Sequence, residues 1–200
     1  SAATEGPVGA VVEEVDGVPA ARRLAELTSL HSGTERWRSV QSLAELATGP
    51  VGSRVVLGFD DGSGRKSVSL AFVEAPPPGE RRPASVVELE RGTWYVDLTR
   101  ASMAEISPRL EAIAAGGGVV FDLRGYPGDA GVGILPHLLA TPETDRWMHV
   151  ARIVGPYGRS AGWNSFGWNL SPSKPRIAGK AVFLTDERAI SYAESVLGYV

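Results

Sequence analysis

The stretch VFLTDERAISYAES, residues 182–195, decides how the chain is organised. It begins with an apolar run that predicts a buried strand, breaks into a short polar turn, and places Ser191 where a helix is expected to begin. A serine in that place has two interpretations. In the first, Ser191 and Glu194 form a capping box, in which the hydroxyl and the carboxylate each accept a hydrogen bond from a backbone N–H. In the second, Ser191 is a catalytic nucleophile.

A second stretch bears on that choice. VVFDLRGYPGD, residues 119–129, is a continuous apolar strand of the type found in parallel sheets, followed by a glycine-rich turn. Acyl transfer by a serine needs backbone N–H donors for the developing oxyanion, one of which is the N–H of the next residue, here Tyr192. Gly128 is the candidate for the other, because glycine lets the backbone approach closely. The alternative is that Gly128 is only a turn residue.

Taken together, the two stretches resemble the paired core motifs of the tail-specific, or C-terminal-processing, serine peptidases and their tricorn-core relatives. Residues 122–129 are similar to the D-L-R-x-N-x-G-G turn, and residues 184–194 to the L-x-(D/N)-x-x-(T/A)-x-S-x-A-E nucleophile segment. The resemblance implies a serine endopeptidase that cleaves unstructured or C-terminal polypeptide segments by acyl-enzyme chemistry. It makes Ser191 the nucleophile and the N–H groups of Gly128 and Tyr192 the oxyanion hole.

Two positions depart from the family pattern. Tyr126 replaces the usual Asn and Asp129 the usual second Gly, which leaves open which backbone N–H completes the oxyanion hole. Two other functions also stay open. One is a non-catalytic PDZ-type peptide-binding module, in which Ser191 is only a cap. The other is a crotonase-like acyl-thioester enzyme, which also uses paired backbone N–H groups and for which Asp129 would be the acidic residue.

The domain organisation follows from the order of elements and breaks. Residues 1–75 combine a short strand and a tight Asp16-Gly17 turn with two helical segments, the second ending near Ala47, and a hairpin around residues 60–64. Residues 76–92 contain Pro76-Pro77-Pro78-Gly79 and several charges, which predicts a linker. Residues 93–200 begin with a strand, a helix and a strand, which predicts a βαβ unit.

The resemblance extends to the first unit. Residues 9–19 and 49–57 are similar to the G-D-x-I-x-x-V-x-G-x-P and G-x-x-G-(S/T)-x-V patterns of the PDZ-like domain that precedes this peptidase core. The fold class expected is therefore α/β. A small PDZ-like α+β domain, incomplete at its start, precedes a partial core of the Clp peptidase/crotonase-like spiral type, truncated after the nucleophile helix begins.

Later in the predicted core, residues 134–140 are expected to form a helix and residues 148–154 a strand. Residues 155–176 are expected to be a long loop rich in glycine and aromatic residues, and loops of that length are often functional. Its side chains Trp163, Phe166 and Trp168 either line a substrate groove or anchor the loop to the core.

The sequence shows no well-placed general base. In the family that this chain resembles, the base is a lysine well downstream of the serine, or a histidine upstream of the PDZ-like domain with a glutamate downstream; either falls outside residues 1–200. Lys180 begins the strand that ends near Leu184. At ~3.3 Å per residue, it is expected more than ~13 Å along the strand from the turn that carries Ser191. His137 is expected on the exposed face of its helix, and His31 and His149 have no partner spacing. The 200-residue chain is therefore expected to be inactive by itself.

The composition limits the kinds of partner and ligand that the chain is expected to bind. The formal charge is −3, 43% of residues are hydrophobic, and there is no cysteine. Neither a nucleic-acid partner nor a membrane span is expected, because no long run of like charge or of apolar residues occurs. Three scattered histidines without cysteine predict no metal site and no cofactor. The oligomeric state and the compartment stay open, although the family resemblance favours an extracytoplasmic location.

Overall fold

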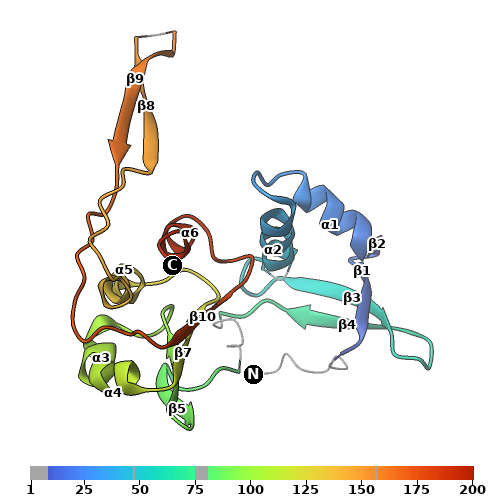
Figure 1. The fold of residues 1–200 in the computed structure, drawn as a ribbon. Helices are drawn as coiled ribbons and strands as arrows, with labels where there is room; N and C mark the ends of the chain where they lie inside the picture. Colours follow the sequence, from blue (N-terminus) through green and yellow to red (C-terminus); the bar gives the residue numbers. More distant parts are fainter. Residues whose placement is uncertain (1–8, 47, 75–80, 156) are drawn as a thin grey trace. The chain divides into compact units, whose positions relative to one another are not determined.

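The computed structural model describes residues 9–46, 48–74, 81–155 and 157–200, and Figure 1 shows its fold. The chain divides into two compact units, Ser1–Arg81 and Arg82–Val200. Ala47 and residues 75–80, which contain the Pro-Pro-Pro-Gly run, lie outside the described residues. Both units mix helices with sheet, as the expected α/β class requires.

The first unit contains a four-stranded antiparallel sheet with the order β2-β1-β3-β4. Its strands are β1 (Val11–Val15), β2 (Val18–Pro19), β3 (Arg54–Asp60) and β4 (Arg65–Ala71). Both predicted turns are confirmed. Asp16 and Gly17 connect β1 to β2 with φ values of 51° and 76°, and the turn after Asp60 connects β3 to β4.

Two helices accompany this sheet, α1 (Ala20–Thr28) and α2 (Glu35–Leu46). They are joined by a chain of hydroxyl hydrogen bonds. The Thr28 hydroxyl donates to the Ser42 hydroxyl over 3.1 Å, and the Ser42 hydroxyl donates to the Arg38 carbonyl over 2.7 Å. Ser42 is completely buried, so these bonds satisfy a polar group that would otherwise destabilise the helix pair.

The second unit is built on a sheet with the strand order β10-β7-β6-β5. Its strands β6 (Thr93–Asp97), β7 (Gly118–Leu123) and β10 (Lys180–Thr185) are parallel, which confirms the predicted βαβ unit. The fourth strand, β5 (Val86–Glu90), runs antiparallel to β6. Residues 86–90 were expected to belong to the linker, so the predicted linker is too long at its C-terminal end.

Helices and 3₁₀ turns cover this sheet and complete its core. They are α3 (Met103–Ile106), η1 (Ser107–Arg109), α4 (Leu110–Ala115), α5 (Asp129–Ile134), η2 (Leu135–His137) and α6 (Tyr192–Leu197). The predicted helix over 134–140 is wrong in its bounds, because the helix starts at Asp129 and tightens into a 3₁₀ turn at Pro136. Fully buried side chains from several of these elements meet in one core, among them Ile106, Ile113, Phe121, Ile134 and Val196.

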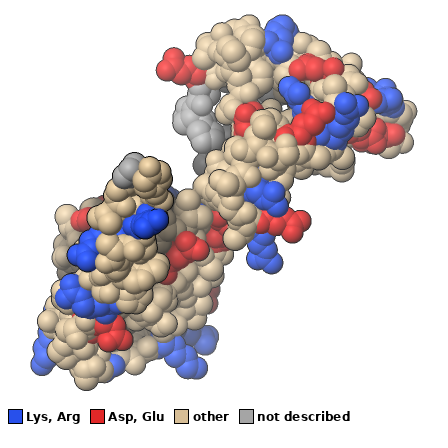
Figure 2. Space-filling view, turned by 90° about the horizontal axis from the view of Figure 1, so that it is seen from above, with Lys and Arg blue, Asp and Glu red and all other residues tan. Residues whose placement is uncertain are grey.

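A separate two-stranded sheet is formed by β8 (Met148–Val154) and β9 (Arg159–Phe166) (Figure 1). β8 confirms a prediction, whereas β9 lies in the segment that was expected to be a loop. Within the described residues, no helix is long and apolar enough to cross a membrane. Basic and acidic side chains are interspersed on the face that Figure 2 shows.

Two completely buried carboxylates, Asp97 and Asp122, lie at or near the carboxyl ends of the neighbouring strands β6 and β7. The guanidinium of Arg82, whose side chain is only 7% exposed, lies 3.1 Å from Asp97 and 3.6 Å from Asp122. Arg124 donates to both oxygens of Asp122, and the Tyr95 hydroxyl donates to Asp122 over 2.6 Å. The network therefore pairs two buried negative charges with arginines from outside the sheet.

The pKa values of these groups reflect the pairing. Burial by itself would raise the pKa of the Asp122 carboxyl, but hydrogen bonds from Arg124 and Tyr95 outweigh it and hold the pKa well below its usual range. The pKa of Asp97 is lowered in the same way, since bonds from Thr99, Arg100 and Arg82 outweigh its burial. Burial and the bond to Asp122 raise the pKa of Tyr95 to about 12.

We expect Asp122→Asn to lower the free energy of unfolding by about 3 kcal/mol or more, because it leaves buried arginine charge without its partner. The matched control is Asp186→Asn. Asp186 pairs with Arg188 two residues later, as Asp122 does with Arg124, but the Asp186 side chain is 19% exposed. We expect the control to cost about 1 kcal/mol or less. Urea unfolding at neutral pH measures both.

The pH dependence gives a second measurement. Carboxyls whose folded pKa is depressed contribute stability that is present above the unfolded pKa, about 3.9, and is lost as the pH falls toward the folded pKa. The difference in stability between wild type and Asp122→Asn should therefore shrink below about pH 4. Equal losses for the two variants at neutral pH, or a difference independent of pH, would contradict the role given to the buried network.

Candidate active site

The two predicted site segments follow neighbouring parallel strands. β10 pairs with β7 in register, from Lys180 opposite Gly118 to Thr185 opposite Leu123. Because parallel strands end at the same edge of a sheet, the segments that follow them leave the sheet side by side. Figure 1 shows β7 and β10 adjacent. The turn around Gly128 and the turn that carries Ser191 thus start from one edge of one sheet.

Ser191 has an unusual backbone. Its φ is 54° and its ψ is −108°, and the residue immediately precedes α6. A residue with a side chain rarely adopts a positive φ, and such strain clusters at active sites. A strained serine on a sharp turn between a strand and a helix is the arrangement by which hydrolases expose a nucleophile. Ser191 is exposed, so its hydroxyl is accessible to a substrate.

Ser102 provides an internal comparison for Ser191, because it too is followed by Glu three residues later. Ser102 has an ordinary extended backbone, with φ −89° and ψ 161°, and makes both halves of a capping box with Glu105. At Ser191 the backbone N–H donates to the Glu194 carboxylate over 2.7 Å. The Glu194 N–H also faces the Ser191 hydroxyl, so both contacts of the predicted capping box are present at Ser191 too, and the difference from Ser102 lies in the backbone. The same sequence pattern therefore has a different backbone at Ser191.

Ser191 lines a pocket of about 620 Å³. The α6 side of the pocket is formed by Ser191 and residues 194–199, namely Glu194, Ser195, Gly198 and Tyr199. The opposite wall comes from the segment that leads into β8 and consists of Glu143, Asp145 and Trp147. A pocket of this size that opens onto an exposed, strained serine is a candidate active site.

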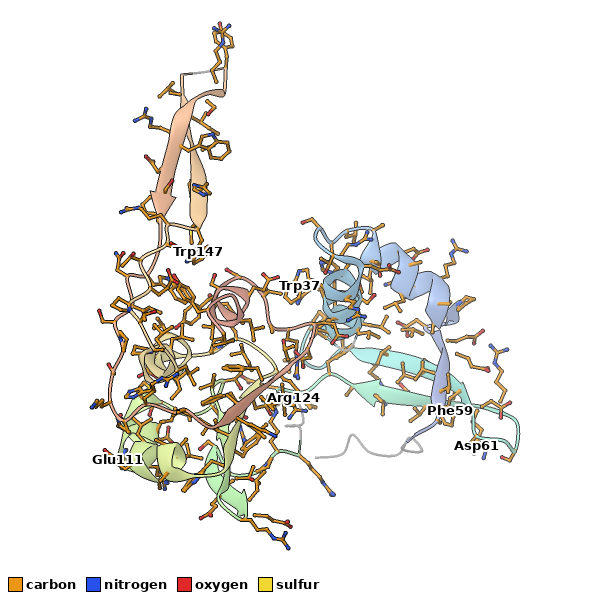
Figure 3. The ribbon with its side chains drawn as sticks, in the orientation of Figure 1. Trp37, Phe59, Asp61, Glu111, Arg124 and Trp147 are labelled. Carbon is orange, nitrogen blue, oxygen red and sulfur yellow. The ribbon has the colours of Figure 1, made fainter. Side chains whose placement is uncertain are left out.

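Aromatic side chains connect the pocket to α6 and to the β8–β9 sheet. Trp168 stacks on Tyr199 with 5.0 Å between ring centroids and a 9° angle between planes, and Trp147 packs edge-on against both rings. The Tyr199 hydroxyl accepts from the Trp147 indole N–H and from the Trp168 backbone N–H. Figure 3 shows Trp147 at the base of the β8–β9 sheet. These contacts fix both pocket walls relative to each other.

Gly128 is not arranged as an oxyanion donor. Its backbone N–H donates to the Leu98 carbonyl over 3.3 Å, so it points toward the end of β6. Gly128 is also absent from the lining of the Ser191 pocket. In this arrangement the Leu98 carbonyl takes the Gly128 donor, so the expectation that the N–H groups of Gly128 and Tyr192 share one cleft stays a prediction.

Tyr192 has a role that the sequence did not suggest. Its hydroxyl accepts from the Val132 backbone N–H over 2.8 Å, in the first turn of α5, and lies 3.4 Å from the Gly128 carbonyl. Burial raises the pKa of this phenol. The Tyr192 side chain thus ties α6 to the start of α5. The backbone N–H of Tyr192 lies at the start of α6. No carbonyl one turn earlier in that helix can therefore accept a hydrogen bond from it.

The other candidate bases lie away from Ser191 or are engaged elsewhere. Lys180 pairs with Gly118 at the far end of β10, as expected. The prediction that His137 is exposed is wrong, because the residue is only 8% exposed and its Nδ1 lies 2.8 Å from the Pro175 carbonyl. His31 contacts Glu45 in the first unit, and His149 contacts Ser165 across the β8–β9 sheet. Across the described ranges, no three His, Cys, Asp or Glu residues group closely enough to hold a metal ion.

The predicted aromatic residues of the long loop separate into two groups. Trp168 belongs to the cluster around Tyr199, whereas Trp163 and Phe166 lie in β9 and are 66% and 48% exposed. The pocket residues Glu143, Asp145, Trp147 and Tyr199 were not predicted. The only feature of the local sequence that could have indicated them is the charged and aromatic run ETDRW before β8. Long-range packing places this run beside α6.

Comparisons with known proteins agree with a peptidase fold. No protein-family model matches the chain, and no curated protein matches it. Among solved structures, mature CPAF, a chlamydial serine protease, matches with a TM-score of 0.65 and 13% sequence identity over 98% of this chain. Mature CPAF complexed with lactacystin gives the same values. The chain spans 62% of the CPAF chain. A candidate peptidase from Parabacteroides merdae is a weaker match. Its TM-score is 0.44 and its sequence identity 10%, over 92% of this chain and 64% of that one.

Proposed function

We propose that this chain carries the nucleophile of a serine-type peptidase and that Ser191 is that nucleophile. The observation that carries the proposal is the strained backbone of Ser191, which differs from the ordinary cap Ser102 although both precede Glu at the same spacing. The pocket beside Ser191 and the peptidase fold shared with CPAF support the same function.

In the proposed reaction, the Ser191 hydroxyl gives its proton to a general base and attacks the carbonyl carbon of a peptide bond. The C–N bond breaks, the amine leaves with that proton, and water then hydrolyses the acyl-enzyme. The backbone N–H of Tyr192 stabilises the negative charge that develops on the carbonyl oxygen. A second donor from the 125–128 turn requires the Gly128 N–H to leave the Leu98 carbonyl. The first donor, the backbone N–H of Tyr192, does not have to leave such a partner.

The general base completes the proposed mechanism. A serine hydroxyl is a weak nucleophile until a base within about 2.6–3.2 Å takes its proton. Among the described residues, no histidine or lysine is hydrogen-bonded to the Ser191 hydroxyl. We propose that the base lies outside residues 1–200, where the tail-specific and tricorn-like families carry theirs.

The first unit is proposed to bind polypeptide as a PDZ-like domain, and the second unit is proposed to form a partial spiral core. Its pocket of about 260 Å³ has apolar walls from both helices and the sheet, among them Val15, Leu27, Leu46, Val55 and Phe72. Arg23 and Gly49 also line it, together with the acidic residues Asp16 and Glu45. Arg23 is the residue of this lining that could pair with the C-terminal carboxylate of an extended peptide.

The first test is cleavage of an unstructured protein by this chain and by a longer protein that includes its flanking segments. We expect cleavage only by the longer protein, and Ser191→Ala should lower its rate by about 10³-fold or more. Ser102→Ala is the matched control, because it removes the other serine of the same S-x-x-E pattern and should leave the rate nearly unchanged.

Cleavage by the longer Ser191→Ala protein at the wild-type rate would remove Ser191 from the mechanism. Ser191-dependent cleavage by the 200-residue chain alone would instead show that the base lies within it.

The second test titrates the chain with unstructured peptides that carry either a free or an amidated C-terminus. We expect the free acid to bind at least about fivefold more tightly, because amidation removes the charge that Arg23 would pair with. Arg23→Ala should abolish the difference. Arg22→Ala is the control, since Arg22 also contacts Glu26 but does not line the pocket. Equal affinity for both peptides would refute carboxylate recognition.

A further inference from the structure

The pocket beside Ser191 has a one-sided charge. Three of its eight lining residues are acidic, Glu143, Asp145 and Glu194, and none is Lys, Arg or His. Two of the carboxylates come from the wall before β8 and one from α6. An apolar side chain that filled the pocket would remove these carboxylates from water without a partner, and an anionic one would be repelled.

The acidic wall is held in place by the backbone. Glu143 exchanges two backbone hydrogen bonds of 2.8 Å with Leu170, which is 9% exposed. The Glu143 carboxylate accepts from the Asp145 backbone N–H over 2.6 Å. The segment that presents both acids is therefore fixed before a ligand binds, which lowers the entropic cost of binding.

The aromatic part of the lining suits a cation as well. Trp147 and Tyr199 pack edge-to-face at 6.1 Å and 80°, joined by the hydrogen bond from the indole N–H. A positive side chain gains energy against the face of a Trp or Tyr ring. A bare metal ion is a poor occupant, because the acids of this pocket form no group of three within metal-binding reach among the described residues.

We propose that this pocket binds the side chain of a lysine or arginine in a polypeptide substrate, next to the bond that Ser191 attacks. The inference rests on the proposed function and names its substrate class. Asp145 and Glu143 pair with the ammonium or guanidinium group, and Trp147 and Tyr199 contact its aliphatic stem and charge. Specificity for basic residues thus arises from the wall before β8, not from the turn that carries the nucleophile.

The test measures binding without catalysis, by fluorescence anisotropy of labelled, otherwise neutral peptides that carry one central arginine, lysine, citrulline or leucine. Citrulline matches arginine in shape and lacks its charge. We expect the chain to bind the arginine peptide about tenfold more tightly than the citrulline peptide. Asp145→Asn and Glu143→Gln, singly and together, should reduce that preference severalfold.

Glu111→Gln is the matched control. It removes one negative charge from an exposed position of α4 in the same unit, outside the pocket, and should leave the preference unchanged. Equal affinity for arginine and citrulline peptides, no binding of either, or an equal effect of Glu111→Gln would overturn the proposal.

The outcome is separable from that of the proposed function. A preference for arginine without Ser191-dependent cleavage by the longer protein would keep the cation site and reject the peptidase. Ser191-dependent cleavage with equal binding of arginine and citrulline would do the reverse.

Discussion

The pairing of Asp97 and Asp122 with arginines is the interaction on which the second unit depends. Two carboxylates at neighbouring strand ends, both completely buried, would repel each other and lose hydration if they stood alone. Arg82 places one positive charge beside both and also donates to the Arg124 carbonyl over 2.9 Å. The first residue of the unit is thereby bound to the edge of the sheet from which the site segments leave.

The same edge carries a second Asp-x-Arg pair. After β10, Asp186 accepts from the backbone N–H and the guanidinium of Arg188, as Asp122 does from Arg124 after β7. Burial by itself would raise the pKa of the Asp186 carboxyl, but the hydrogen bonds from Arg188, together with the charges of Arg188 and Arg82, hold the pKa below its usual value. The segment that leads from β10 to Ser191 thus begins with an Asp186–Arg188 pair, which resembles the Asp122–Arg124 pair at the end of β7. A strained residue persists only where its surroundings over-determine it. At Ser191, the Asp186–Arg188 pair precedes the strained residue, and the buried side chains of Ala193 and Val196 follow it.

The sequence predicts best the elements whose cause is local. Apolar runs identify β7 and β10, the Asp16-Gly17 pair identifies its turn, and Ser191 is placed correctly at the start of a helix. β9 was missed because its sequence, RSAGWNSF, carries neither a clear alternation nor a continuous apolar run.

The remaining differences have long-range causes. The sequence does not show that the Leu98 carbonyl takes the Gly128 N–H, or that Pro175 lies over His137. The acidic and aromatic residues before β8 likewise line the Ser191 pocket only because Leu170 and Tyr199 bind this segment through long-range hydrogen bonds. Ser191 was proposed as the nucleophile from sequence, whereas its strained backbone, which differs from that of the ordinary cap Ser102, is visible only in the structure.

Covalent labelling with a fluorophosphonate, which reacts with activated serines, tests directly whether Ser191 is the nucleophile. The protein carrying residues 1–200 together with its flanking segments would be treated, digested and mapped by mass spectrometry. We expect one adduct on the peptide that contains Ser191, absent from the Ser191→Ala variant and retained in the Ser102→Ala variant. Labelling at another serine, or equal labelling of the Ser191→Ala protein, would contradict it.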